Sequence, residues 1–268
     1  MISVIRSGID VALNDLSVTS NNIANAKTTG FKKRQATFAD IYGQTESIKM
    51  SGARIGMGAL TIENRLMSEQ GSLQQTGDVL DLAIEGQGMF TLVDAVRPDE
   101  KLYSRDGSFT VNSDGLIANA EGMQLMSALG AAITVPTTAN TATMINGTQT
   151  FVEAPLTGVA VRSDGTVEAT YGKNNTFFVG QIGLANFADP NRLTPIGQNY
   201  FKENNRSGAG ILGAPIEEGR GKLHSGALEM SNIDMTSELT NLMRAQQAFS
   251  GSSRLLQSET EMARKFTQ

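Results

Sequence analysis

Residues 2–26 have the sequence ISVIRSGIDVALNDLSVTSNNIANA, and this stretch decides the fold. Small and apolar residues recur in it at alternating spacings of three and four, which is typical of a helix that packs against another helix. Polar residues such as Arg6 and Asp10 lie between them, and residues 28–30 (TTG) follow as a helix stop signal. We therefore predict an amphipathic helix. Its apolar stripe consists of Ile2, Ile5, Ile9, Ala12, Leu16, Thr19, Ile23 and Ala26.

The C-terminal segment, residues 235–268, carries the same kind of pattern. Apolar residues recur there every seven positions, and Leu239 adds a second line. Ser231 and Asn232 precede the segment as candidate N-caps. Gly251 inside the predicted helix either marks a bend or allows a neighbouring backbone to approach closely. The seven-residue repeat consists of Met235, Leu242, Phe249, Leu256 and Ala263.

The interior of the chain has a different pattern. It holds most of the 28 glycines and many short alternating apolar runs, several of them separated by Asp-Gly pairs. Asp-Gly between alternating apolar residues is a strong hairpin signal. We predict an α+β fold in which the N- and C-terminal α-helices pair as a coiled-coil-like layer beside a central all-β domain. The predicted domains are an assembly-core helix at 1–30, an extended linker with short strands at 31–75, a β-rich outer domain at 76–225 and a second assembly-core helix at 226–268.

Composition excludes several classes of protein. The 268 residues, 40% of them hydrophobic, are enough for one or two domains with a sizeable core. The net charge is −5 and there is no basic block, which argues against nucleic acid as the main partner. The absence of cysteine excludes disulfides and thiolate metal sites. No stretch has the roughly 18 apolar residues of a membrane span, and the charged N-terminus does not resemble a cleavable signal peptide.

No pattern of residues indicates an enzyme. The single histidine, His224, has no G-x-S-x-G elbow to pair with, and we interpret it as a polar surface or interface residue. One histidine without cysteine argues against a zinc site. The glycine runs at 86–88 and 208–210 lack the context of a nucleotide-binding loop, and the first helix carries too little basic charge to bind anionic lipid strongly. We therefore predict no catalytic, cofactor-binding or metal-binding residues.

The two predicted helices leave open what covers their apolar stripes. A single isolated helix is marginal in water, so each stripe needs a partner. The helices could pair with each other within one chain and go no further. Alternatively, the pair exposes more apolar surface than one partner covers, and neighbouring copies bury the rest. A head-to-tail contact that does not close then builds a helical tube. Periodicity alone does not choose between these two hypotheses.

A set of short motifs favours assembly over pairing within one chain, because together the motifs resemble the family of flagellar rod and hook subunits. The resemblance runs in order over nearly the whole chain. The motifs are NNIAN (21–25), TGFK (29–32), LDLAIEGQGMF (80–90), YSRDGSF (103–109), GQIGLANF (180–187), GQNYF (197–201), SNID (231–234), ELTNL (238–242) and AQQAF (245–249). The signature residues within them are Asn21, Asn22, Asn25, Gly30, Phe31, Ser231 and Asn232.

The resemblance implies a structural subunit that polymerises helically through its terminal helices into a hollow tube, which transmits torque and passes exported subunits. It implies export without a cleavable signal peptide and assembly into the flagellar basal body, in the periplasm or outside the cell. The implied partners are other copies of the chain, neighbouring rod and hook proteins, the flagellar export apparatus and, as a further candidate, the surrounding bushing rings. The chain length favours the distal rod subunit. A hook-like FAD run at 38–40 keeps a short hook subunit open, together with a proximal rod subunit.

The signature residues also have expected physical roles. We expect Asn21, Asn22 and Asn25 to bond free carbonyls at the helix end or to bridge to another chain. We expect Gly30 to adopt the left-handed conformation and Phe31 to anchor the linker. Before assembly the terminal segments are expected to be partly disordered and to fold as they bind. One alternative from another class is a non-polymerising, adhesin-like β-rich binding module with a helical stalk, which would tolerate the loss of either end.

Overall fold

The computed structural model describes residues 2–42, 56–97, 99–145, 148–172 and 175–266, and it divides into two compact units. Unit 1 combines the two ends of the chain and comprises residues 1–26, 32–67 and 233–268. Unit 2 comprises residues 27–31 and 68–232, so it is inserted between parts of unit 1.

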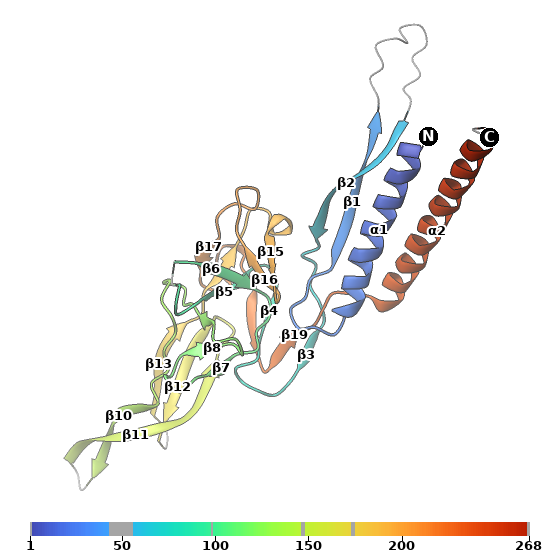
Figure 1. Cartoon of the computed structure of the whole chain (residues 1–268). Helices are drawn as coiled ribbons and strands as arrows, with labels where there is room; N and C mark the ends of the chain where they lie inside the picture. Colours follow the sequence, from blue (N-terminus) through green and yellow to red (C-terminus); the bar gives the residue numbers. More distant parts are fainter. Residues whose placement is uncertain (1, 43–55, 98, 146–147, 173–174, 267–268) are drawn as a thin grey trace. The chain divides into compact units, whose positions relative to one another are not determined.

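Unit 1 contains two helices and two strands, labelled in Figure 1: α1 (Ile2–Ala24), α2 (Met235–Phe266), β1 (Arg34–Tyr42) and β2 (Gly56–Leu66). Two contacts define how the helices pair. The Asn22 amide donates to the Glu238 carboxylate at 3.1 Å, and a Cβ atom on Gly8 would lie 3.5 Å from the Ser252 hydroxyl. The same number of residues separates these contacts on each helix. The helices therefore run antiparallel and keep the same register along α1.

Local hydrogen bonds define the helix ends that face the rest of the chain. At the end of α1, the Asn25 side chain donates to the Asn21 carbonyl at 2.9 Å, and the same carbonyl accepts the backbone N–H of Asn25 at 3.2 Å. At the start of α2, the Asp234 carboxylate accepts the backbone N–H of Thr236 at 3.0 Å. Asp234 is thus the N-cap. The sequence-based choice of Ser231 and Asn232 was wrong, because a cap must stand directly before the first helical residue.

Strands β1 and β2 form an antiparallel pair that runs from Arg34 opposite Leu66 to Tyr42 opposite Gly56. The pair packs on α1. The Asn14 amide donates to Asn64 at 3.0 Å, and the Ser7 hydroxyl accepts the backbone N–H of Ala59 at 3.3 Å. The region expected to be an extended linker with short strands therefore holds strands of 9 and 11 residues. Helix α1 gives them a surface to pack on.

Unit 2 is almost entirely built from antiparallel strands. Its largest sheet contains β5 (Met89–Val93), β6 (Lys101–Ser104), β7 (Thr110–Val111), β8 (Ile117–Ala118), β9 (Gln124–Leu125), β14 (Leu184–Asn186), β15 (Thr194–Gly197), β16 (Tyr200–Lys202) and β17 (Ile211–Gly213). A second sheet contains β10 (Thr138–Ile145), β11 (Thr148–Val161), β12 (Thr166–Tyr171) and β13 (Asn175–Gln181). Two smaller pairs join β4 (Leu82–Glu85) to β18 (Lys222–Ser225) and β3 (Leu73–Gln75) to β19 (Ala227–Glu229). Short 3-10 helices lie at Pro190–Arg192 and Glu217–Gly219.

A single hydrophobic core holds unit 2 together. All five residues of β5 are buried, and the rings of Phe90 and Phe109 meet edge to face with their centroids 5.2 Å apart. The predicted Asp-Gly turns shape this core. Gly115 and Gly165 adopt positive φ angles of 77° and 80°, whereas a side chain on Gly107 would collide with the Leu82 carbonyl. Two terminal helices and a central β-rich part confirm the α+β prediction.

A buried ion pair joins Arg105, which follows β6, to Glu229 in β19, near the point at which the chain leaves unit 2. The Arg105 guanidinium lies 3.0 Å from the Glu229 carboxylate, and both side chains are almost completely buried. Glu229 also accepts the backbone N–H of Gly71 at 2.9 Å through its side chain and that of Gly30 at 2.8 Å through its carbonyl. Gly30 has a φ of 65°, and a side chain there would collide with the backbone of Asp106.

Breaking this pair should destabilise unit 2 strongly. Arg105→Ala leaves the Glu229 carboxylate buried without its cation, and we expect the free energy of unfolding to fall by about 3–5 kcal/mol. Urea unfolding followed by tyrosine fluorescence measures this, because Tyr103, Tyr171 and Tyr200 lie in unit 2. As a matched control, Arg162→Ala breaks the pair with Glu168, in which Arg162 is exposed, and should cost less than about 1 kcal/mol. If both variants lost the same free energy of unfolding, the buried pair would contribute no more to the stability of unit 2 than an exposed one, and the prediction would be wrong.

Candidate assembly interface

Unit 1 has very little hydrophobic core of its own. Within the part of the chain that the structure describes, its buried apolar side chains are Ala12, Val18, Leu66 and Ala245, and two of these are alanines. The core cluster of unit 2 contrasts with this, because it includes fully buried Leu, Ile, Phe and Tyr side chains from many strands. Burying a large apolar side chain contributes about 1.5–3 kcal/mol, so unit 1 gains little from its own interior.

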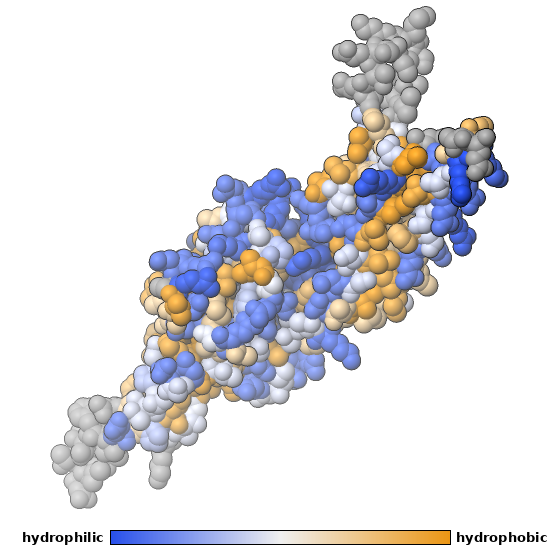
Figure 2. Space-filling view, in the orientation of Figure 1, coloured by the Kyte–Doolittle hydropathy of each residue, from blue (hydrophilic) through white to orange (hydrophobic). Residues whose placement is uncertain are grey.

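Most of the exposed large apolar side chains in the described residues lie instead on unit 1. Figure 2 shows the corresponding apolar surface, in orange, along the two helices. Contiguous exposed apolar surface of this kind typically marks an interaction site. The exposed residues are Ile2, Val4 and Leu13 on α1, Phe38, Ile41, Tyr42, Met57, Leu60 and Ile62 on β1 and β2, and Met235, Leu239, Met243, Leu255, Met262 and Phe266 on α2.

The predicted stripe of α1 lies in the helix pair only in part. Ala12 and Thr19 are buried, Ile5, Ile9, Leu16, Ile23 and Ala26 are half-buried, and Ile2 is exposed. The half-buried residues have apolar surface that unit 1 does not cover.

The predicted stripe of α2 divides in the same way. Leu242, Phe249 and Leu256 are half-buried, whereas Met235 and Leu239 are exposed. The buried residues of α2 are Glu238 and Ala245, which follow Met235 and Leu242 by three positions, so the line that faces α1 is displaced from the predicted repeat. The sequence-based analysis also missed Met243, Leu255 and Met262, because it followed a single repeat. Their apolar character outside that repeat was the available signal.

A buried polar network connects α1, β1 and α2. The Asn22 side chain accepts the backbone N–H of Arg34 at 3.0 Å and donates to the Arg34 carbonyl at 2.8 Å. It also donates to Glu238, whose other carboxylate oxygen lies 2.5 Å from the Lys33 ammonium. Asn22 and Glu238 are each only 1% exposed. Buried polar groups of this kind stabilise a unique arrangement when every member has its partners.

The network lies beside a cleft of about 360 Å³ within unit 1, lined mainly by polar residues of α1, β1 and α2. Burial raises the pKa of the Asp15 carboxyl in this cleft, and the negative charge of Glu238 raises it further. Burial also lowers the pKa of the Arg34 guanidinium. The charges of both signs in the cleft therefore lie close together in a partly desolvated place.

The remaining signature residues lie near the ends of the two helices, and the buried Ser231 hydroxyl has no hydrogen-bond partner among the described residues. Asn21 is exposed, Phe31 is buried, and Ser231 is buried just before α2. The Asn232 amide donates to the Glu69 carbonyl at 3.0 Å.

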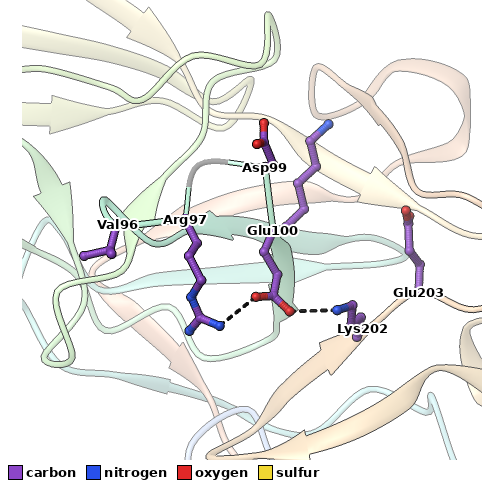
Figure 3. Close-up of a pocket in the computed structure, with 7 residues that line it drawn as sticks. Val96, Arg97, Asp99, Glu100, Lys202 and Glu203 are labelled. Carbon is purple, nitrogen blue, oxygen red and sulfur yellow. Dashed lines mark hydrogen bonds and ion pairs between the residues drawn. The ribbon is translucent and has the colours of Figure 1, made fainter.

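A second hollow lies in unit 2. It has a volume of about 750 Å³ and is lined largely by charged residues. Figure 3 shows Glu100 between Arg97 and Lys202, at 3.0 and 2.7 Å. These charges neutralise one another, and among the described lining residues Val96 is the only apolar one. The hollow therefore lacks the apolar lining of a typical small-molecule site.

Other features also fail to indicate a catalytic centre. His224 lies 2.5 Å from the Glu85 carboxylate on the surface of unit 2, where Lys222 pairs with the same carboxylate at 2.9 Å. The pKa of Glu85 is lowered by these hydrogen bonds, first by Lys222 and then by His224. Among the described residues, no three His, Asp or Glu side chains gather as a metal site would require. Neither described helix is both long and apolar enough to cross a membrane.

Comparison with known proteins gives a consistent result over the whole chain. Three family models match: "Flagella basal body rod protein" at residues 4–32, "Flagellar hook protein FlgE/F/G D1 domain" at 83–169 and "Flagellar basal body rod FlgEFG protein C-terminal" at 224–268. The flagellar basal-body rod protein FlgG of Agrobacterium fabrum is 35% identical over 98% of this chain and 96% of its own length. The proteins of the same name from Bacillus subtilis and Caulobacter vibrioides are 34% and 32% identical, each over 98% of this chain and over 97% and 96% of their own lengths.

Removal of the Asn22 side-chain amide should lower the stability of unit 1. Asn22→Ala leaves the N–H of Arg34 and the carboxylate of Glu238 short of a partner, and we expect a loss of about 1–3 kcal/mol. Helix ellipticity at 222 nm during thermal unfolding reports this, because the long helices belong to unit 1. The control is Asn21→Ala, because Asn21 is the exposed neighbour of Asn22. Its midpoint of thermal unfolding should be close to that of the parent chain. A parent-like midpoint for Asn22→Ala would show that the network contributes nothing.

The raised pKa of Asp15 predicts a dependence of stability on pH. The folded state holds the Asp15 proton more tightly than the unfolded state does, so stability falls as pH rises through the folded-state pKa. Asp15→Asn removes this cost. It should raise the helix-unfolding midpoint at pH 7, and its advantage should shrink as pH falls toward about 4, where unfolded Asp is protonated. A pH-independent benefit at Asp15 would contradict this account.

Proposed function

We propose that this chain, which belongs to the family of flagellar basal-body rod and hook proteins, polymerises helically through unit 1 into a hollow axial tube. Family membership makes it a structural subunit of the flagellar basal body and not an enzyme. The finer assignment to the distal rod is part of the proposal. It is supported by the relatives named FlgG, which match nearly the full length of the chain.

The imbalance of apolar surface in unit 1 is the observation that carries this proposal. Unit 1 buries few apolar side chains and exposes many, on α1, on β1 and β2, and on α2. Surfaces on four elements are more than one partner of a closed pair would cover. Repeated contacts with several neighbouring copies would bury them, and contacts that do not close give a helical polymer. The predicted stripes, from Ile2 to Ile23 and from Met235 to Leu256, would contribute to these contacts.

The thin core also supports the expectation that the ends fold during assembly. Short or weakly packed helices are marginal in water, and unit 1 has few large side chains in its interior. Helix content would then rise as subunits polymerise. Unit 2, with its own core, would fold independently as the outer domain, and the helical segments would form the assembly core.

The wider partners belong to the proposal as well. Neighbouring rod and hook proteins would contact the ends of the tube, and the export apparatus would pass the chain without cleaving a signal peptide. Assembly would follow in the periplasm or outside the cell. The surrounding bushing rings are a further candidate partner for the outer surface. The alternative of a non-polymerising, β-rich binding module is disfavoured by the exposed apolar surface on unit 1, which such a monomer would leave in water.

Polar substitution of the exposed strand surface should abolish the polymer. In Leu60→Asp/Ile62→Asp, two exposed apolar residues of β2 become charged, and we expect tubes to disappear by electron microscopy while unit 2 stays folded. Deletion of residues 1–26 or 235–268 should have the same effect. The control Ile196→Asp/Ile211→Asp changes equally exposed residues of unit 2 and should leave tubes intact. A full-length chain that elutes as a monomer and behaves like its truncated forms would instead favour the binding module.

A further inference from the structure

Strand β13 is an open edge of the four-stranded sheet in unit 2. The strand order is β10, β11, β12, β13, so β13 has a partner strand on one side only. Its sequence, NTFFVGQ, contains no charged residue and no proline, which are the residues that usually protect a sheet edge. At the end of the strand, the Ala128 N–H donates to the Gln181 carbonyl at 2.9 Å. A bulge at Val179 comes before it, so residues 175–178 form the regular part of the open edge.

The pairing of β12 determines which backbone groups of β13 face outward. The Arg162 N–H donates to the Thr166 carbonyl, so Thr166 and every second residue after it bond to β11. The residues between them bond to β13. Thr176 lies opposite Thr170, which is one of the residues that bond to β11, and Phe178 lies two positions further along β13. The N–H and C=O groups of Thr176 and Phe178 therefore face away from the sheet.

Large apolar side chains border this open edge. Phe177 and Phe178 are 43% and 68% exposed, and as neighbours in a strand they lie on opposite faces of the sheet. The Phe177 ring meets the Tyr171 ring edge to face, with the centroids 5.8 Å apart. Leu129, in the turn that reaches Gln181, is 97% exposed. A strand added to β13 would cover part of this apolar surface and would bond the outward backbone groups.

The same sheet carries a two-stranded arm, which consists of β10 and the part of β11 that pairs with it. The pairing runs from Thr138 opposite Pro155 to Ile145 opposite Thr148, whereas β12 pairs with β11 only from Leu156 onward. Figure 1 shows the arm projecting beyond β12 and β13. A ribbon of two strands is marginal in water, and a third strand stabilises it.

The outer edge of β10 is the side of the arm that suits a third strand. Strand β10 contains no charged residue and no proline, whereas the paired part of β11 contains Glu153 and Pro155. The Leu156 N–H donates to the Thr137 carbonyl, so every second residue of β10 from position 139 onward bonds to β11. The residues between them, including Ala142, have N–H and C=O groups that face outward.

The arm and the open edge cannot pair within one chain, because β10 and β13 are the opposite edges of one sheet. Resting on the proposed function, we propose that β10 of one copy adds to β13 of a second copy. The four strands alternate in direction, so a second copy in the same orientation brings its β10 antiparallel to β13. The contact is heterologous and leaves one edge free on each copy, as a growing polymer requires. A two-fold pairing of β13 with β13 would leave both arms uncovered.

Hydrogen exchange in the tubes tests this contact. In parent tubes, the N–H groups of Thr176 and Phe178 should exchange about tenfold more slowly, or slower still, than in the non-polymerising Leu60→Asp/Ile62→Asp chain. Ala142→Pro removes an outward N–H of β10, so unit 2 should unfold in urea as the parent does, and tubes should still form through unit 1. In those tubes the two N–H groups should lose their protection, although β13 itself is unchanged. The control Ala142→Thr keeps the backbone N–H and should keep the protection.

A second variant acts from the other side of the contact. Thr176→Pro removes an outward N–H of β13, and the Phe178 N–H should then exchange rapidly in tubes. The Phe177 N–H, which bonds to β12, should stay protected in every sample and serves as an internal reference. Nuclear magnetic resonance of tubes dissolved in an aprotic solvent resolves the single amides.

Three results would overturn the proposal. Protection of Thr176 and Phe178 that persists in Ala142→Pro tubes would show that a different strand covers β13. Rapid exchange of both N–H groups in parent tubes would refute the added strand and leave the proposed function intact. A parent chain that forms no tubes would contradict the proposed function as well.

Discussion

The amide of Asn22 holds together three segments that are far apart in the sequence. It satisfies both backbone groups of Arg34 and reaches Glu238 on the other terminal helix. The rest of unit 1 depends on this point, because few large apolar side chains are buried there to fix how α1, β1 and α2 meet. Hydrophobic burial is non-directional, whereas a fully satisfied buried amide selects one arrangement. The polar network thus sets the geometry on which the exposed apolar surface is displayed.

The two units differ in where they bury their apolar side chains. Unit 2 gains its stability internally, through a core in which strand β5 is wholly buried and through a buried ion pair near its entry and exit. Unit 1 presents apolar surface on each of its elements and has little to bury it against. Such a division suits a subunit whose outer part must be stable alone and whose inner part must be completed by neighbours. Stability and assembly are then carried by separate sets of residues.

Sequence patterns predicted the parts of this structure that depend on local periodicity. The two terminal helices and the glycine turns at Gly115 and Gly165 follow from spacing and from backbone sterics. The pairing of Asn22 with Glu238 could not be predicted, since it joins residues 216 positions apart. The same holds for the strand pairing of β4 with β18 and of β5 with β14. The length and pairing of β1 and β2 could not be predicted, because the strands lie on α1 and pair residues that are up to 32 positions apart, such as Arg34 and Leu66. Exposed residues such as Met243 and Leu255 lie outside the repeat that defined the helix.

The hydrogen bond between Gly30 and the Glu229 carbonyl has a consequence for how such chains diversify. It places the entry and the exit of unit 2 side by side, at a separation of one hydrogen bond. An inserted module with adjoining ends can lengthen, shorten or be exchanged for another without altering the spacing of the two terminal helices. Natural selection can therefore vary the outer module freely while the inner layer keeps its dimensions.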